Sequence, residues 1–378
     1  MNFSYKGGLV LLFFLLLSGC WNAKELGEES YVTAIGIDFH DGRYTIYTQL
    51  LDFSSIVTQE NNKAAEPIPL YIGEVSGRTI NDAIFDLYRT SQIPINWAHI
   101  GTIVYSESVL EHGLEEVHES LQKNGEFRYT PWVFGTKNSI REILTITGFF
   151  QLPPLYTILY SPEKMFDMNS YIEPKRLHTF IAEYKEAGKI SLLPSISINK
   201  TQWSQSAKAL EPKNTLIIDG AFPIDSQKGL AKEWLSFAEL VGKRWLLDTA
   251  DNIPLDFYEG GEIKGSVNVT DTKGEVEVTT NGNKAEFTVT VKASGSLTDL
   301  EEDLSLDTIE QLITRQIEEE IRQTYNKAIE KEADVYYVKN KLFHQGTKPD
   351  KLNEYMLDND SLKQITVDFH LRSKGPYN

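Results

Sequence analysis

The chain carries a single cysteine, Cys20, at the end of an apolar N-terminal segment. Leu9 to Leu17 is an unbroken apolar run, Lys6 precedes it, and Leu17-Ser18-Gly19-Cys20 follows with no acidic residue before the cysteine. These features are typical of a secretory signal peptide that ends in a lipobox and is cleaved between Gly19 and Cys20. With its only thiol acylated, the mature protein has none left for a disulfide bond. We therefore expect its fold to rely on hydrophobic cores.

A transmembrane anchor is the alternative interpretation of the same segment. An apolar helix over residues 9–17 would be about 14 Å long at about 1.5 Å per residue, far short of the ~30 Å hydrocarbon core of a bilayer. A diacylglycerol on Cys20 instead supplies two acyl chains, which hold a protein stably at a membrane. The sequence therefore predicts that residues 1–19 are removed and that Cys20 is lipidated, with no other cofactor. Candidates for contact with the membrane or a partner are Trp21, Lys24, Glu25 and Leu26, although Leu26 could equally begin the fold.

The composition is that of a folded acidic protein. Hydrophobic residues make up 41% and aromatic residues 11% of the chain, and the formal net charge is −17. Such a surface is repelled by nucleic-acid phosphates and by anionic lipid headgroups. The charge argues against nucleic-acid binding and leaves anchoring to the lipid. A protein of this size exported without disulfides indicates the extracytoplasmic face of a Gram-positive membrane.

Hydrophobic patterns predict an α+β fold. Asp41-Gly42 and Asn281-Gly282 each separate two strand-like runs, which is a strong signal for antiparallel hairpins. Apolar residues recur at helical spacing over residues 79–91, 109–122, 176–187 and 307–332. We expect several lobes, three in all, with mostly antiparallel sheets packed by long amphipathic helices. The polar segment 200–214 is the predicted major boundary, between an N-terminal region 20–200 with two α+β lobes and a C-terminal α+β domain 213–378.

No catalytic constellation is evident in the sequence. It lacks a phosphate-binding glycine loop, a nucleophile elbow and a His-Glu-x-x-His motif. One histidine, His99, and one cluster of histidines and glutamates each allow a structural and a functional interpretation. His99 either satisfies nearby backbone groups or senses pH. A cluster on a predicted helix comprises Glu111, His112, Glu115, Glu116, His118 and Glu119. It is either a solvated helix face, which we favour, or a divalent-metal site that could serve a hydrolase. No catalytic or metal-binding residue is therefore assigned.

Several blocks of the sequence resemble the Ger(x)C spore-germination lipoproteins. Cys20-Trp21-Asn22-Ala23-Lys24-Glu25-Leu26 is similar to the C-W-x-x-[RK]-E-[LI] start of the mature proteins of that family. The blocks that follow in the family's order include Thr33–Asp38, Trp97-Ala98-His99 and Asp219–Phe222. Two departures fall in the C-terminal half. Residues 335–338 lack the glycines usual there, and residues 344–363 lack an aromatic-rich end. These departures indicate either altered contacts in this lobe or a divergent paralogue.

The resemblance implies a non-enzymatic C subunit of a nutrient germinant receptor in an endospore former. Such subunits lie on the outer face of the spore inner membrane and work with integral-membrane A and B subunits. The family's fold is three α+β lobes, and the one position that carries over is the lipid acceptor Cys20. The alternative is a lipoprotein solute-binding component of a transporter, a class with parallel α/β lobes joined by hinge strands.

Overall fold

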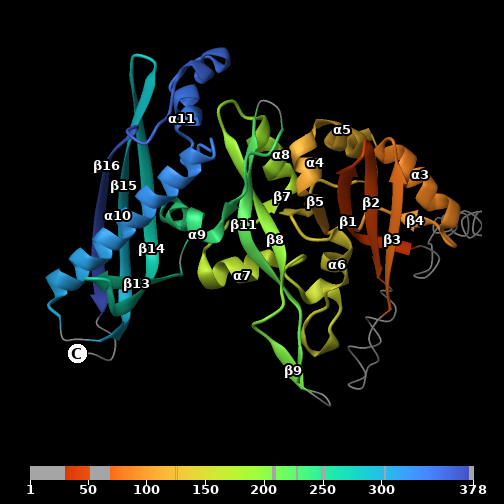
Figure 1. Cartoon of the computed structure of the whole chain (residues 1–378), viewed down its shortest axis with the longest axis horizontal. Helices are drawn as coiled ribbons and strands as arrows, with labels where there is room; N and C mark the ends of the chain where they lie inside the picture. The colour runs from red at the N-terminus through yellow and green to blue at the C-terminus, as the bar shows by residue number, and fades with distance from the viewer. Residues whose placement is uncertain are drawn as a thin grey trace, which may run out of the picture.

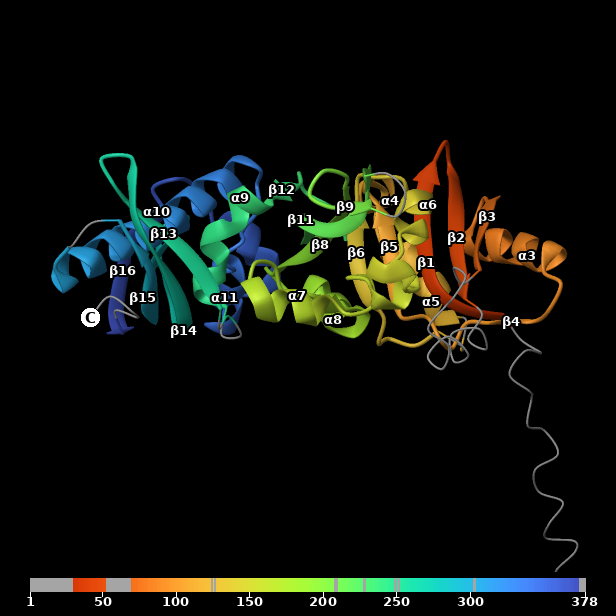
Figure 2. The same ribbon diagram turned by 90° about the horizontal axis from the view of Figure 1, so that it is seen from below.

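The computed structural model describes residues 30–373, except 52–68, 124, 126, 207–209, 227, 228, 248, 249, 251, 302 and 303. Within these residues the strands form a ten-stranded sheet, a four-stranded sheet and a two-stranded ribbon. The two large sheets belong to two lobes that lie side by side along the long axis of the molecule (Figures 1 and 2). The predicted multi-lobe α+β fold is confirmed. None of the helices in the described ranges is long and apolar enough to cross a bilayer.

The N-terminal lobe is built on the ten-stranded sheet, whose main order is β12-β11-β8-β6-β5-β1-β2-β3. Its outer pairs are antiparallel, as predicted, whereas the central pairs β1–β5, β5–β6 and β6–β8 are parallel. Parallel neighbours require crossover connections, which here contain helices. The strands are β1 (Ser30–His40), β2 (Arg43–Leu51), β3 (Leu70–Gly77), β4 (Ile95–Asn96), β5 (Thr102–Ser106), β6 (Trp132–Thr136), β7 (Lys175–Arg176), β8 (Ile190–Asn199), β11 (Thr215–Asp225) and β12 (Leu235–Ser236).

Helices cover both faces of this sheet, so its central strands are buried on both sides. Ile35 and Ile103 pack in the core under α3, α4, α5 and α8, whereas their neighbours Ala34 and Val104 pack in the core under α6. Successive side chains of a strand point to opposite faces, which explains the nearly continuous apolar runs. The helices are α3 (Ile80–Thr90), α4 (Glu107–His112), α5 (Glu115–Lys123), α6 (Ile140–Thr145), α7 (Pro162–Asn169) and α8 (Leu177–Lys185), with 3₁₀ turns η1 (Phe149–Gln151) and η2 (Pro154–Tyr156).

Local capping explains where these helices begin and end. The Thr79 side chain accepts a hydrogen bond from the Asp82 N–H at the start of α3, as expected of an N-cap. The helix predicted over 109–122 is instead two helices, α4 and α5. They are separated at Gly113, whose φ of 116° no right-handed helix accommodates.

The predicted boundary at residues 200–214 lies inside the ten-stranded sheet. β11 pairs antiparallel with β8 from Thr215 opposite Asn199 to Asp225 opposite Ile190. The polar segment between them carries the exposed ribbon β9 (Ser204–Ser206) and β10 (Leu210–Pro212). The strand that follows this segment thus belongs to the same sheet as the strand before it, and the division into regions 20–200 and 213–378 stays a prediction. Polarity marks an exposed connection but does not distinguish a linker from a long hairpin.

The C-terminal lobe follows β12 and packs one long helix, α10 (Leu306–Glu330), across a sheet of order β13-β14-β15-β16 (Figure 1). Both predicted hairpins are present: Asp41 and Gly42 have positive φ in the turn between β1 and β2, and Gly282 has positive φ between β14 and β15. The remaining elements are α9 (Phe237–Leu240), η3 (Val241–Leu246), β13 (Ile253–Glu259), β14 (Glu262–Asn281), β15 (Lys284–Leu300), α11 (Val338–His344), η4 (Pro349–Glu354) and β16 (Leu362–Ser373).

The divergent segment after Asp334 forms part of this lobe's core. Tyr336 is 1% exposed, its ring lies 6.1 Å from that of Tyr325, and its hydroxyl donates to the Ile321 carbonyl. The next residue, Tyr337, has a φ of 59°, a conformation that glycine adopts most easily. A tyrosine thus occupies a backbone position that favours glycine, and its ring faces the junction between the lobes.

Candidate functional site at the junction between the lobes

The sequence-predicted site residues Gly19, Cys20, Trp21, Lys24, Glu25 and Leu26 lie outside the described residues. Cleavage and lipidation at Gly19 and Cys20, and membrane or partner contact by the residues that follow, therefore stay predictions.

The acidic helical cluster is dispersed in the structure. The His112 ring stacks on that of Phe39 at 3.7 Å, and Glu116 accepts a hydrogen bond from the Tyr44 hydroxyl. Glu111, Glu115 and Glu119 are exposed, as expected of a solvated face. His118, which helical spacing predicts on the same face, is only 3% exposed, because it lies on the side of α5 that packs into the core. Among the described residues, no three His, Cys, Asp or Glu side chains are placed to share a metal ion.

His99 lies beside β1 at the start of the sheet. Its ring contacts that of Tyr31 edge-on, with 4.9 Å between the ring centroids. This contact places the ring against the first strand, and the two interpretations of His99 stay predictions.

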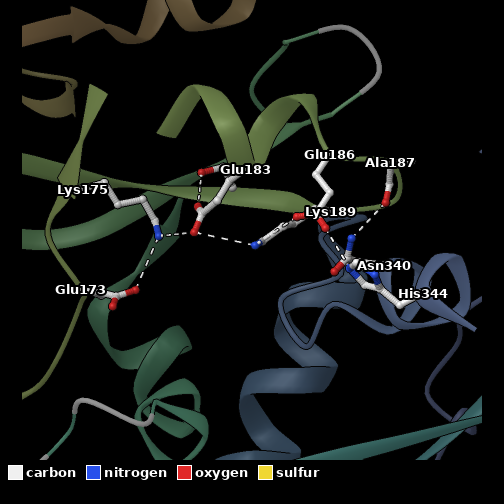
Figure 3. Close-up of polar contacts among 9 residues, drawn as sticks. Glu173, Lys175, Glu183, Glu186, Ala187, Lys189, Asn340 and His344 are labelled. Carbon is white, nitrogen blue, oxygen red and sulfur yellow. Dashed lines mark hydrogen bonds and ion pairs between the residues drawn. The ribbon is translucent and has the colours of Figure 1, made fainter. Parts of the chain in front are cut away.

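What the structure brings together instead is a polar junction between α8, β8 and α11 (Figure 3). The Asn340 side-chain amide donates to the Ala187 carbonyl, and His344 Nε2 lies 2.8 Å from Glu186 Oε1. Between them Gly188 has a φ of 71°, and a Cβ there would lie 2.9 Å from the carbonyl of Lys339. Glycine therefore permits both the turn after α8 and the close approach of the two lobes.

A chain of ion pairs continues from this contact into the N-terminal lobe (Figure 3). Glu183 lies at its centre. One of its oxygens is 2.9 Å from Lys175 Nζ and 3.9 Å from Lys189 Nζ, and the other accepts from the Ser191 hydroxyl at 2.7 Å. Lys175 is only 5% exposed and also lies 3.6 Å from Glu173. A lysine this buried requires such partners to remain charged.

Glu186 links the ion pairs to α11. Burial raises the pKa of its carboxyl, but hydrogen bonds from Asn340, His344 and Lys189 outweigh burial and hold the pKa below its usual value. The carboxylate thus stays ionised and available to both lobes at neutral pH.

A small cavity of about 30 Å³ lies beside the ion pairs, between the lobes. Lys243 of η3 lines it, is 7% exposed, and has its Nζ 4.0 Å from the centre of the Tyr337 ring. Burial, followed by the charge of Lys175, lowers the Lys243 pKa to about 7, against the opposing effect of Asp334, Glu173 and Glu183. The cavity is lined by Tyr171, Ile172, Glu173, Lys175 and Leu192 of the N-terminal lobe and by Leu240, Lys243, Leu247 and Tyr337.

Replacing Lys243 with methionine should raise the free energy of unfolding at pH 7 by about 2 kcal/mol, because burying a charged amine costs more than its contact with the Tyr337 ring returns. The folded-state pKa lies below the unfolded value, so the stability contributed by Lys243 falls as pH drops from about 10.5 to 7. Urea unfolding at pH 7 and pH 10 checks this. The free energy of unfolding of the wild type should rise relative to that of Lys243→Met between pH 7 and pH 10. A variant less stable than the wild type at both pH values would contradict the expectation.

The chemistry of the junction is that of a structural joint. Its ion pairs around Glu183 lie within the N-terminal lobe, the contact of Glu186 with His344 crosses between the lobes, and its cavity has room for about one water molecule. Sequence reasoning identified none of Lys175, Glu183 and Lys243, because they come from separate elements and form no motif. The available signal was Gly188, where the helical pattern over 176–187 ends.

Both halves of the chain match models of known protein families. A family model described as "Spore germination protein N-terminal domain" matches residues 22–198, and one described as "Spore germination B3/ GerAC like, C-terminal" matches residues 225–375. Spore germination protein KC of Bacillus subtilis (strain 168) is 25% identical over 335 residues, which cover 84% of this chain and 82% of that protein. Spore germination protein B3 of the same organism is 21% identical over 341 residues, covering 84% and 83%.

A solved structure has the same fold. The crystal structure of the GerBC protein superposes with a TM-score of 0.51, covering 90% of this chain and 96% of that chain at 15% sequence identity. At this identity the likeness supports the fold alone. The two family models, however, account for most of the chain, in the order in which its lobes occur. The chain therefore belongs to the Ger(x)C family of spore germination proteins.

Proposed function

We infer that this protein is a non-enzymatic subunit of a spore nutrient germinant receptor. The observation that carries the inference is the match of the two germination-protein models to residues 22–198 and 225–375. In this role a diacylglycerol on Cys20 holds the body on the outer face of the spore inner membrane, beside integral-membrane A and B subunits. The lipobox at Leu17-Ser18-Gly19-Cys20 supports the anchor.

Two features of the fold favour this role over a transporter's solute-binding component. That class has two parallel α/β lobes around a ligand cleft, whereas here only the N-terminal lobe has parallel central strands, and β13, β14 and β15 of the C-terminal lobe are antiparallel. The cavity at the lobe junction is also about the size of one water molecule. Lys175 beside it is paired with Glu173 and Glu183, and the contacts of Asn340 and His344 join the lobes, which suits a junction that holds the lobes in register within a receptor.

Changing Cys20 to alanine should release the protein from the membrane fraction and impair nutrient-triggered germination, because no acyl chain can then be attached. Immunoblots of fractionated spores and the loss of optical density after nutrient addition measure the two effects. Ser18→Ala is the matched control, since it keeps a small residue in the lipobox and should leave anchoring intact. Normal nutrient-triggered germination in a strain that lacks this gene and its paralogues would contradict the receptor role.

A further inference from the structure

An exposed cluster of apolar side chains projects from the N-terminal lobe, and nothing described so far uses it. We call Phe149, Phe150, Trp203 and Leu210 the aromatic tip; their exposed fractions are 42%, 95%, 53% and 75%. These residues come from two separate segments, which meet where the Phe149 ring contacts that of Trp203 edge-on at 5.0 Å, and Leu210 lies on the ribbon that follows Trp203. In Figure 1 the β9 ribbon that follows Trp203 extends to the lower edge of this lobe.

The backbone at Phe150 is held in an unfavourable conformation. Its φ of 57° and ψ of 31° lie in the left-handed region, which is disfavoured for residues with a side chain. The same residue is 95% exposed, so the fold gains almost no apolar burial from it. A strained and exposed phenylalanine contributes little to the stability of the lobe, which indicates that its side chain serves a contact outside the chain.

The charge around the tip differs from that of the whole protein. No charged residue occurs between Glu142 and Glu163, although the chain carries a net charge of −17. The second segment has Lys200 and Lys213 on either side of the ribbon, and the sequence between them carries Lys208 and Glu211. Lys213 Nζ donates to the Thr147 hydroxyl, which ties the two segments together. The tip therefore avoids the acidic repulsion that keeps the rest of the surface from an anionic bilayer.

We propose that the aromatic tip inserts into the membrane interface as a second contact beside the lipid. Phenylalanine, tryptophan and leucine with flanking lysines make up the composition of interfacial membrane contacts. The inference rests on the proposed anchor at Cys20. Ten residues lead from Cys20 to the first described residue, Ser30, a reach of at most about 35 Å. The anchor therefore keeps the body within that distance of the bilayer, and a second contact at the tip would fix which face of the N-terminal lobe meets the membrane.

An environment-sensitive dye at position 150 tests the insertion. The mature chain with a hexahistidine tag in place of Cys20 contains no other cysteine, so Phe150→Cys can be labelled with nitrobenzoxadiazole at one site. The tag attaches it to phosphatidylglycerol vesicles that contain nickel-chelating lipid, with the natural tether preserved. The emission of the dye should shift to shorter wavelength on vesicle attachment. Met356→Cys, at a 65% exposed position of the other lobe, is the matched control and should show no shift.

The untethered chain gives a second measurement. Phe150→Asp combined with Trp203→Gln should reduce sedimentation with phosphatidylglycerol vesicles at least about tenfold, since two aromatic side chains no longer leave water. Its melting temperature should stay unchanged or rise, because aspartate tolerates the left-handed conformation better than phenylalanine.

Each other outcome overturns the proposal. Equal emission of the two labels on vesicles would mean that the tip stays in water. A shift that requires spore membranes containing the integral-membrane subunits, and is absent with pure lipid, would mean that the tip docks on protein. Because the tag replaces the acyl chains, a failure of lipidation at Cys20 leaves this experiment unaffected, and the two proposals fail separately.

Discussion

Replacing Arg244 with alanine should lower the free energy of unfolding by about 3–5 kcal/mol, because the substitution leaves a buried carboxylate without its cation. Arg244 Nη2 lies 3.1 Å from each oxygen of Glu320, and the Trp245 Nε1–H donates to the same carboxylate at 2.8 Å. Arg244 is 4% and Glu320 is 7% exposed. The pair joins η3 to the centre of α10, so it holds the long helix against the segment that lines the lobe junction.

Urea unfolding of three variants distinguishes a broken pair from a lost side chain. The double variant Arg244→Met with Glu320→Met should lose less stability than Arg244→Ala, because it leaves no unpaired charge and only the buried Trp245 N–H without its acceptor. Arg372→Ala is the surface control. Arg372 lies 2.7 Å from Asp271 but both side chains are more than half exposed, so the loss should stay below about 1 kcal/mol. A loss for Arg244→Ala as small as that of Arg372→Ala would contradict the expectation.

Local patterns predicted the elements whose structure is set locally. Thr79 caps α3, Asp41-Gly42 forms the first hairpin turn, and the apolar stripe of 307–332 becomes α10. Features that join distant segments were not predictable in this way. The pairing of β8 with β11 crosses a polar stretch that has the composition of a linker, and Arg244 meets Glu320 only because η3 packs on α10.

The same distinction applies to the candidate site. The lipobox is a linear motif that depends only on consecutive residues, so the sequence alone is sufficient to predict lipidation at Cys20. The ion pairs around Glu183 and the contact of Phe149 with Trp203 depend on where the sheet places separate segments. His118 shows the limit most clearly: helical spacing placed it near glutamates, whereas the structure places it between two tyrosines in the core.

Acid should destabilise the protein through His118. Its ring nitrogens lie 3.2 Å from the Tyr105 hydroxyl and 2.8 Å from the Tyr184 hydroxyl. Burial, assisted by the charge of Lys185, lowers its pKa from 6.5 to about 3. In the unfolded chain the His118 ring therefore binds a proton below about pH 6.5, whereas in the folded protein it stays neutral down to about pH 3. Stability should fall by about 1.4 kcal/mol per pH unit in this window, or about 3 kcal/mol by pH 4.

Carboxylates also titrate as the pH falls, so the measurement is the difference between the wild type and His118→Gln. Glutamine keeps a donor and an acceptor for the two tyrosines but binds no proton. The free energy of unfolding of this variant, measured in urea from pH 7 to pH 4, should therefore decline less steeply than that of the wild type. His40→Gln, on the exposed hairpin turn, is the matched control and should follow the wild-type curve. Parallel curves for wild type and His118→Gln would mean that the buried ring accepts its proton in the folded state, by local opening of α5 from Tyr105 and Tyr184.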